Sequence, residues 1–101
     1  MPTDQFGIGS SNLAGVIPPI GRLSKRFDIS IYVVGGAVRD LLLNRSVSDL
    51  DLLVDGDVAN ASLWMSEEFA GKRIILDHER QIHRVILGEG YEIHHIDIAQ
   101  Q

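Results

Sequence analysis

The sequence predicts an α+β, α/β-like fold in which helices flank a mixed five-stranded sheet. Apolar residues at helical spacing alternate with short β-branched runs through much of the chain, an alternation typical of such folds. The last part of the chain instead holds three successive strand candidates. The predicted order is therefore helix, strand, helix, strand, helix and three strands.

Three segments carry helical spacing. The first follows the proline pair at 18–19 and ends near residue 28, and the second covers 37–43. The third begins after residue 57 and continues to about residue 70. Asp57 is placed to cap the third helix. The inward face of that helix is predicted to hold Val58, Ala61, Met65 and Phe69.

Five short apolar segments predict strands. The first is rich in β-branched residues and bounded by glycine, and the second is too apolar to lie fully exposed to water. The five segments are 31–34, 50–54, 73–76, 83–87 and 92–98.

The length and composition fit one compact domain with a modest core, because the chain has 101 residues and is 45% hydrophobic. Residues 1–12 are polar and contain glycine, so we expect a flexible tail there and a folded domain over 13–101. No apolar run approaches the roughly 20 residues that span a bilayer, and the N-terminus lacks the features of a secretory signal. We expect a cytoplasmic protein with no membrane partner.

Composition also excludes several kinds of site. The chain has no cysteine, which rules out disulfides, thiolate metal sites and a cysteine nucleophile. The formal net charge of -5 argues against strong nucleic-acid binding by this chain alone, because neutralising phosphates needs clustered lysine and arginine. His94 and His95 are adjacent, so a strand would point them to opposite sides, and no zinc-site spacing is present.

Gly35 and Gly36 lie between a strand candidate and a helix candidate. Without a Cβ atom, the backbone there can approach a ligand closely, and the following helix N-terminus offers free N–H groups to an anion. The pair could therefore hold phosphates. A tight turn that only glycine can make is the structural alternative.

Asp49 and Asp51 are two residues apart on the second strand candidate, so their side chains point to the same face. Two unpaired carboxylates held close together repel each other unless a cation lies between them. Oxygen-only ligands suit Mg²⁺, which completes its shell with water and substrate phosphates. An exposed edge strand is the alternative, although the neighbouring leucines argue against full exposure.

The last strand candidate supplies a third carboxylate. Its alternation predicts that Tyr91, Ile93, His95 and Asp97 share one face. An adjacent strand could bring Asp97 beside Asp49 and Asp51. Three carboxylates around two divalent ions can align a hydroxyl with a phosphate and stabilise the leaving oxygens, which is the two-metal solution to phosphoryl transfer.

Taken together, these motifs resemble the head domain of class II tRNA nucleotidyltransferases and bacterial poly(A) polymerases, within the polymerase β-like nucleotidyltransferase superfamily. The resemblance runs from about residue 20 to the C-terminus. It rests on YVVGGAVRDLLLNRSVSDLDLLVDGD, with weaker support from LDHERQIHRVIL and HIDIA. The glycine pair, the RD pair within the following helix and the DxD agree in spacing, whereas a GG or a DxD alone would be unspecific.

The resemblance implies roles for individual residues. Asp49 and Asp51 would be the metal-binding and catalytic carboxylates, with Asp97 as a further catalytic carboxylate. The backbone at Gly35 and Gly36 would contact the triphosphate. A second implication concerns the RD pair: Arg39 would lie near the phosphates or brace the metal site, with Asp40 as a structural partner and not a ligand.

The implied chemistry is an enzyme reaction in which an RNA 3′-hydroxyl attacks the α-phosphate of CTP or ATP and pyrophosphate is released. Mg²⁺ is the implied cofactor, in a two-metal site, and tRNA or another RNA 3′ end is the implied partner. Members of this family continue with an RRDFTIN-like motif and a base-reading neck segment, which are absent from this sequence. We therefore expect a head-domain fragment, inactive or nearly so by itself, with an unpaired sheet edge that favours self-association.

Three other interpretations remain open. A Rossmann-like dinucleotide-binding module also begins with strand, glycine turn, helix and strand, and Asp55 lies near the position of a ribose-binding acid, but GGAVRD lacks the GxGxxG spacing. A minimal nucleotidyltransferase acting on a protein or small molecule would share the DxD chemistry. A noncatalytic interaction domain would bind neither Mg²⁺ nor nucleotide through Asp49 and Asp51.

Overall fold

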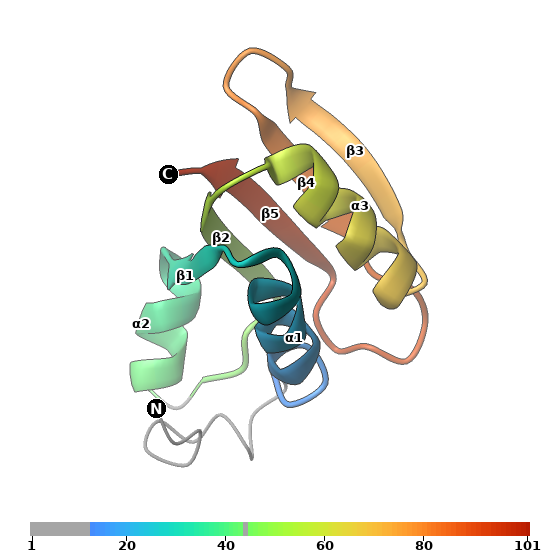
Figure 1. The fold of residues 1–101 in the computed structure, drawn as a ribbon. Coiled ribbons are helices and arrows are strands. Elements are labelled where there is room, and N and C mark those ends of the chain that lie inside the picture. Colours follow the sequence, from blue (N-terminus) through green and yellow to red (C-terminus); the bar gives the residue numbers. More distant parts are fainter. Residues whose placement is uncertain (1–12, 44) are drawn as a thin grey trace.

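A computed structural model of the chain describes residues 13–43 and 45–101, and it confirms the predicted order of elements (Figure 1). The predicted tail, residues 1–12, lies outside this part. No described helix is both long and apolar enough to cross a membrane. The elements are α1 (Ile17–Phe27), β1 (Ser30–Val34), α2 (Gly36–Leu42), β2 (Asp49–Asp55), α3 (Val58–Glu68), β3 (Lys72–Asp77), β4 (Ile82–Ile86) and β5 (His95–Gln100).

The described strands form the predicted mixed five-stranded sheet, in the order β1-β2-β5-β4-β3. Only β2 and β5 pair in parallel, and the other three neighbouring pairs are antiparallel. In a Rossmann unit the first two strands run parallel. The antiparallel pairing of β1 with β2 therefore contradicts the dinucleotide-binding interpretation.

One face of the sheet forms the core. The inward residues of β2 and β5 are at most 1% exposed, and α1 and α3 lie over this face (Figure 1). An ion pair of 3.0 Å between Arg22 and Glu68 joins the two helices at the surface. The buried strand residues are Leu50, Leu52 and Val54 of β2, Ile96 and Ile98 of β5, and His83 and Val85 of β4.

Helix α3 begins as the sequence predicts. The side chain of Asp57 accepts a hydrogen bond of 3.2 Å from the backbone N–H of Asn60, which satisfies one free donor of the first turn. All four residues predicted to face inward are buried. The helix ends at Glu68, earlier than the predicted end near Ala70, because Ala70 has a φ of 50° and a left-handed residue stops a helix.

The segment before β5 corrects one prediction. Tyr91 and Ile93 do not share the face of His95 and Asp97, because the strand begins only at His95. Ile93 is 1% exposed, and the Tyr91 ring meets that of Phe69 edge-on at 5.4 Å. Burying Ile93 and packing the Tyr91 ring against the core outweighs continuing the alternation of an extended strand.

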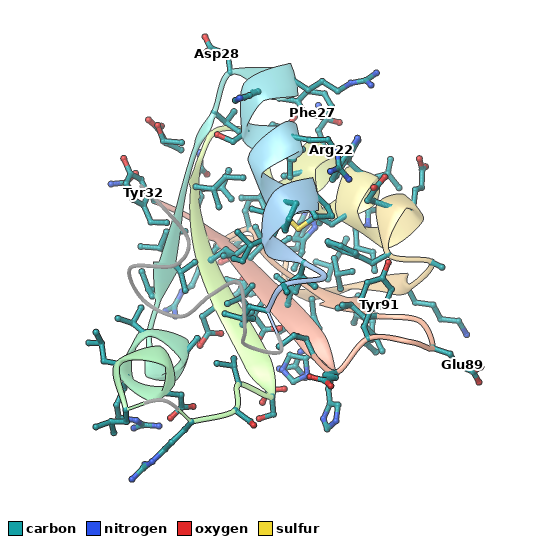
Figure 2. The ribbon with its side chains drawn as sticks, turned by 90° about the horizontal axis from the view of Figure 1, so that it is seen from below. Arg22, Phe27, Asp28, Tyr32, Glu89 and Tyr91 are labelled. Atoms are coloured by element: carbon teal, nitrogen blue, oxygen red, sulfur yellow. The ribbon has the colours of Figure 1, made fainter. Side chains whose placement is uncertain are left out.

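The opposite face of the sheet is not covered by α1 or α3. Tyr32 of β1 points away from these two helices (Figure 2) and is 48% exposed. Helix α2 contacts β1 and β2 and contributes Ala37 to the core. We refer to the surface opposite α1 and α3 as the open face.

Candidate functional site

The predicted carboxylates lie on the open face, in rows that cross the strands. Asp51 is opposite Asp97 of β5, and Asp97 is opposite Arg84 of β4. In the next row, Asp49 is opposite His95. Because directly opposed residues point to the same side of a sheet, these five side chains share one surface.

The alternation of β2 accounts for this placement. Leu50 and Leu52 are buried on the covered face, so Asp49 and Asp51, which alternate with them, project from the other side. Strand β2 lies between β1 and β5. The interpretation of the aspartate pair as part of an exposed edge strand is therefore wrong.

Arg84 holds Asp97 through two hydrogen bonds. Its Nε donates to Oδ1 at 2.7 Å and its second terminal nitrogen donates to Oδ2 at 3.0 Å. His95 lies between two carboxylates, with Nδ1 3.3 Å from Asp49 and Nε2 3.9 Å from Asp97. Asp51, in contrast, has no hydrogen bond or ion pair with another described residue.

The charges in this site perturb one another. Burial raises the pKa of Asp51 above its usual value, and the neighbouring Asp97 carboxylate raises it further, while His95 opposes the shift. The hydrogen bond with Asp97 raises the pKa of Arg84. The ionised form of Asp51 is therefore disfavoured unless a cation approaches it.

The glycine turn lies directly beside Asp51. Gly35 joins β1 to α2 with a φ of 73°, a conformation that costs glycine little. A Cβ atom at Gly35 would come within 3.0 Å of Oδ2 of Asp51. The absence of a side chain at Gly35 therefore keeps one side of this carboxylate clear.

Arg39 lies at the outer side of the turn. A Cβ atom at Gly36 would be 3.3 Å from a terminal nitrogen of Arg39, and Nε of Arg39 is 3.5 Å from Asp40. The predicted pairing of Arg39 with Asp40 is thus confirmed. The Arg39 side chain is 68% exposed, and it forms no ion pair with Asp49, Asp51 or Asp97.

The donor set fits a magnesium site built on two carboxylates. Asp49 and Asp51 offer oxygen ligands, and Mg²⁺ commonly uses one or two carboxylates with water and phosphate oxygens. Because Gly35 has no side chain, its backbone lies close to Asp51 without a collision. Among the residues that the structure describes, no group of three or more histidine, aspartate or glutamate side chains is arranged to hold a metal ion. Asp97 instead engages Arg84 with both oxygens.

Two residues of this surface escaped prediction from the sequence. No sequence motif marks Arg84, and the alternation places His95 on the face of Asp97 without indicating its contact with Asp49. The alternation of buried His83 and Val85 around Arg84 marks its side chain as pointing outward. Which carboxylate it meets depends on strand register, which the sequence does not state.

Solved structures of similar fold include CCA-adding enzymes. One solved with CTP is 24% identical, with a TM-score of 0.81, over 99% of this chain and 24% of that chain. One solved with ATP is 22% identical, with a TM-score of 0.82 and the same coverage. The Thermotoga maritima CCA-adding enzyme complexed with tRNA is 30% identical, with a TM-score of 0.68, over 79% of this chain and 18% of that chain.

The chain thus spans about a quarter or less of the length of these proteins. Comparison with curated protein sequences gives no significant match. The family model of the poly A polymerase head domain matches residues 31–101, which include the glycine turn, the DxD and β5. This match covers most of the sequence, and the chain belongs to the poly A polymerase head domain family.

Proposed function

We propose that this chain is the catalytic head of a cytoplasmic RNA 3′-end nucleotidyltransferase that transfers CMP or AMP from CTP or ATP to tRNA or another RNA. The observation that carries the proposal is the row of Asp51 and Asp97 on the open face, with Asp49 on the same face and Gly35 beside Asp51. Membership of the head-domain family supports it. Structures of similar fold were solved with CTP, with ATP and with a primer tRNA and an ATP analogue.

Asp49 and Asp51 would hold magnesium on the open face, with Asp97 as the third carboxylate. Gly35 and Gly36 would leave the triphosphate room to approach these carboxylates, and Arg39 would supply positive charge near the phosphates. Bound magnesium would neutralise charge on the phosphates and on the attacking oxygen, in a two-metal arrangement. The other residues of the open-face site would position the substrates.

In the proposed reaction, the RNA 3′-oxygen forms a bond to the α-phosphorus of the nucleoside triphosphate. The bond from that phosphorus to the bridging oxygen breaks, and pyrophosphate leaves with the electron pair. The proton of the 3′-hydroxyl passes to a carboxylate or to water. The RNA is lengthened by one nucleotide.

The decisive experiment is a titration of the 101-residue chain with Mg²⁺, with and without CTP or ATP, followed through amide NMR shifts. We expect the shifts to concentrate at Gly35, Asp49, Asp51 and Asp97. Asp51→Asn should abolish the response. Asp55→Asn is the matched control, because Asp55 lies on the same strand and face but at its far, exposed end.

Equal shifts in the Asp51→Asn chain, or no response in a folded wild-type chain, would contradict the proposed site. In a longer protein that contains this head, Asp49→Ala or Asp51→Ala should abolish nucleotide incorporation while the fold is retained. Full activity of either variant would overturn the assignment of these carboxylates.

We also propose that edge strand β3 pairs with a second copy of the chain. β3 is an outer strand, and Ile74, Ile75 and Leu76 are each 43–47% exposed, so the edge is an apolar template for another strand. Lys72 lies at one end of this strand and Asp77 at the other. Antiparallel self-pairing would bring opposite charges together.

Sedimentation velocity across a concentration series tests this pairing. The wild-type chain should show a reversible monomer–dimer equilibrium, and Ile75→Lys should shift it to monomer. Val38→Lys is the control, because Val38 is also exposed but lies on α2. A wild-type chain that stays monomeric at high concentration would refute the proposal.

A further inference from the structure

Arg84 is the only cation that holds a carboxylate on the described open face by two hydrogen bonds. It lies on β4, directly across from Asp97 on β5, and its two donors reach both oxygens of Asp97 at 2.7 and 3.0 Å. Asp97 is in turn directly across from Asp51. Three charged side chains therefore stand in one row across three adjacent strands.

The geometry makes the three carboxylates unequal. A planar guanidinium that donates two parallel hydrogen bonds to one carboxylate is a strong, orientation-specific partner. The Arg84 and Asp97 side chains are only 34% and 22% exposed, so water competes for their bonds less than at a fully exposed pair. Asp49 meets only the His95 ring, at 3.3 Å, and Asp51 has no polar partner among the described residues.

A divalent cation and a guanidinium compete for the same carboxylate oxygens. Arg84 already binds both oxygens of Asp97. Asp51 lies opposite Asp97 and forms no ion pair with a cationic side chain of the described residues. We propose that Arg84 is a positioning residue that withholds Asp97 from a divalent cation, so that the cation first binds Asp49 and Asp51 and gains Asp97 only when Arg84 releases it. This inference rests on the metal site of the proposed function.

The test compares the Mn²⁺ affinity of four folded chains by electron paramagnetic resonance of the free ion: wild type, Arg84→Met, Asp97→Asn and the double variant. Arg84→Met frees a charged ligand, so the dissociation constant should fall about tenfold when Asp97 is present. In the Asp97→Asn background the same substitution should change it by less than about twofold. This difference between the two backgrounds is the signature of a withheld ligand.

Removing a positive charge also attracts cations by simple electrostatics, and a control separates this effect. Lys72 lies on the same face, because it is opposite Ile86 and Ile86 is opposite His95. It forms no ion pair with another described residue. Lys72→Met should change the Mn²⁺ affinity by less than about twofold. An equal gain from Arg84→Met in both Asp97 backgrounds would overturn the inference, since the arginine would then act only as a diffuse charge.

A metal-free measurement tests the ion pair itself. The Arg84 Nε–H proton should exchange slowly with water in the wild-type chain and rapidly in Asp97→Asn, as read from ¹H–¹⁵N spectra. Rapid exchange in the wild-type chain would overturn the inference without reference to metal.

The outcomes separate this inference from the proposed function. Mn²⁺ binding that is lost in Asp49→Asn, combined with equal gains in the two Asp97 backgrounds, would leave the proposed metal site standing and refute only the role of Arg84. Absence of Mn²⁺ binding in both the wild-type and Arg84→Met chains would refute both.

Discussion

The two faces of the central strands differ in almost every physical property although they come from the same residues in alternation. On β2, Leu50, Leu52 and Val54 are at most 1% exposed under α1 and α3, while Asp49 and Asp51 stand on the open face. The covered face holds the domain together, and the open face gathers like charges that repel. Alternate residues of one strand therefore differ in role: the apolar ones stabilise the fold, and the charged ones form the candidate site.

The largest effect is expected on the covered face. Leu52→Ala removes a side chain that is 1% exposed and should lower the free energy of unfolding by about 2–5 kcal/mol, because it leaves a cavity. Leu53→Ala, one residue further on the open face, should cost much less. Urea unfolding of both variants measures the contrast, and equal losses would contradict the division between the faces.

Gly35 lies in the turn between β1 and α2, and Gly35→Ala is expected to lower both stability and metal binding. With a φ of 73° and a Cβ atom 3.0 Å from the Asp51 carboxylate, alanine should cost roughly 1–2 kcal/mol of stability. It should also weaken Mg²⁺ binding in the NMR titration. For stability alone, Gly36→Ala is the control, because Gly36 begins α2 and has no positive φ. Unchanged stability and metal binding in Gly35→Ala would show that the turn tolerates a side chain.

The covered face contains one titratable group that should make stability depend on pH. His83 is 2% exposed, with Nδ1 2.8 Å from the Ser62 hydroxyl, and its Nε2 has no hydrogen-bond partner among the described residues. Burial lowers its pKa below the usual 6.5, and Arg73 and His78 lower it further against the opposing effect of Asp57. The unfolded chain therefore takes up a proton first as the pH falls.

The sign follows from this difference in proton uptake. Stability contributed by neutral His83 is present above pH 6.5 and is lost as the pH falls below that value. As the pH falls from 7 to about 5.5, the wild-type chain should therefore lose more stability than His83→Gln. Urea unfolding at several pH values measures this, with His94→Gln, an exposed histidine, as the control. Parallel profiles for wild type and His83→Gln would contradict the prediction.

The smallest expected effect has the opposite sign and lies on the open face. The raised pKa of Asp51 means that its ionised form opposes folding above the usual value of 3.8, and this cost disappears as the pH falls through the folded-state pKa. Asp51→Asn should therefore stabilise the metal-free chain at pH 7, by roughly 0.5 kcal/mol. Thermal unfolding checks this, and destabilisation at pH 7 would show that the carboxylate has a structural role.

Much of this division was predictable from sequence, because it depends on local rules. The alternation around Asp49 and Asp51 gave their common face, Asp57 identified the cap of α3, and the glycine pair identified the turn before α2. The neighbours of β5 were not predictable, since sheet register is a long-range property that no local pattern encodes. For that reason Arg84 and the position of His95 emerged only from the structure. Tyr91 and Ile93 pack against the core and do not continue the alternation of β5.

The position of β5 in the sheet has a consequence for how the domain forms. Strands β1 and β2 pair with each other, and so do β3 and β4, but β5 lies between these two pairs and joins them. Among the five described strands, β5 comes last in the sequence. During synthesis, two antiparallel pairs can form early, yet the open face stays divided, with Asp51 on one pair and Arg84 on the other, until β5 inserts between them. The row of Asp51, Asp97 and Arg84 is therefore complete only when the long-range strand pairings of β5 have formed. Such long-range contacts are the slowest to form.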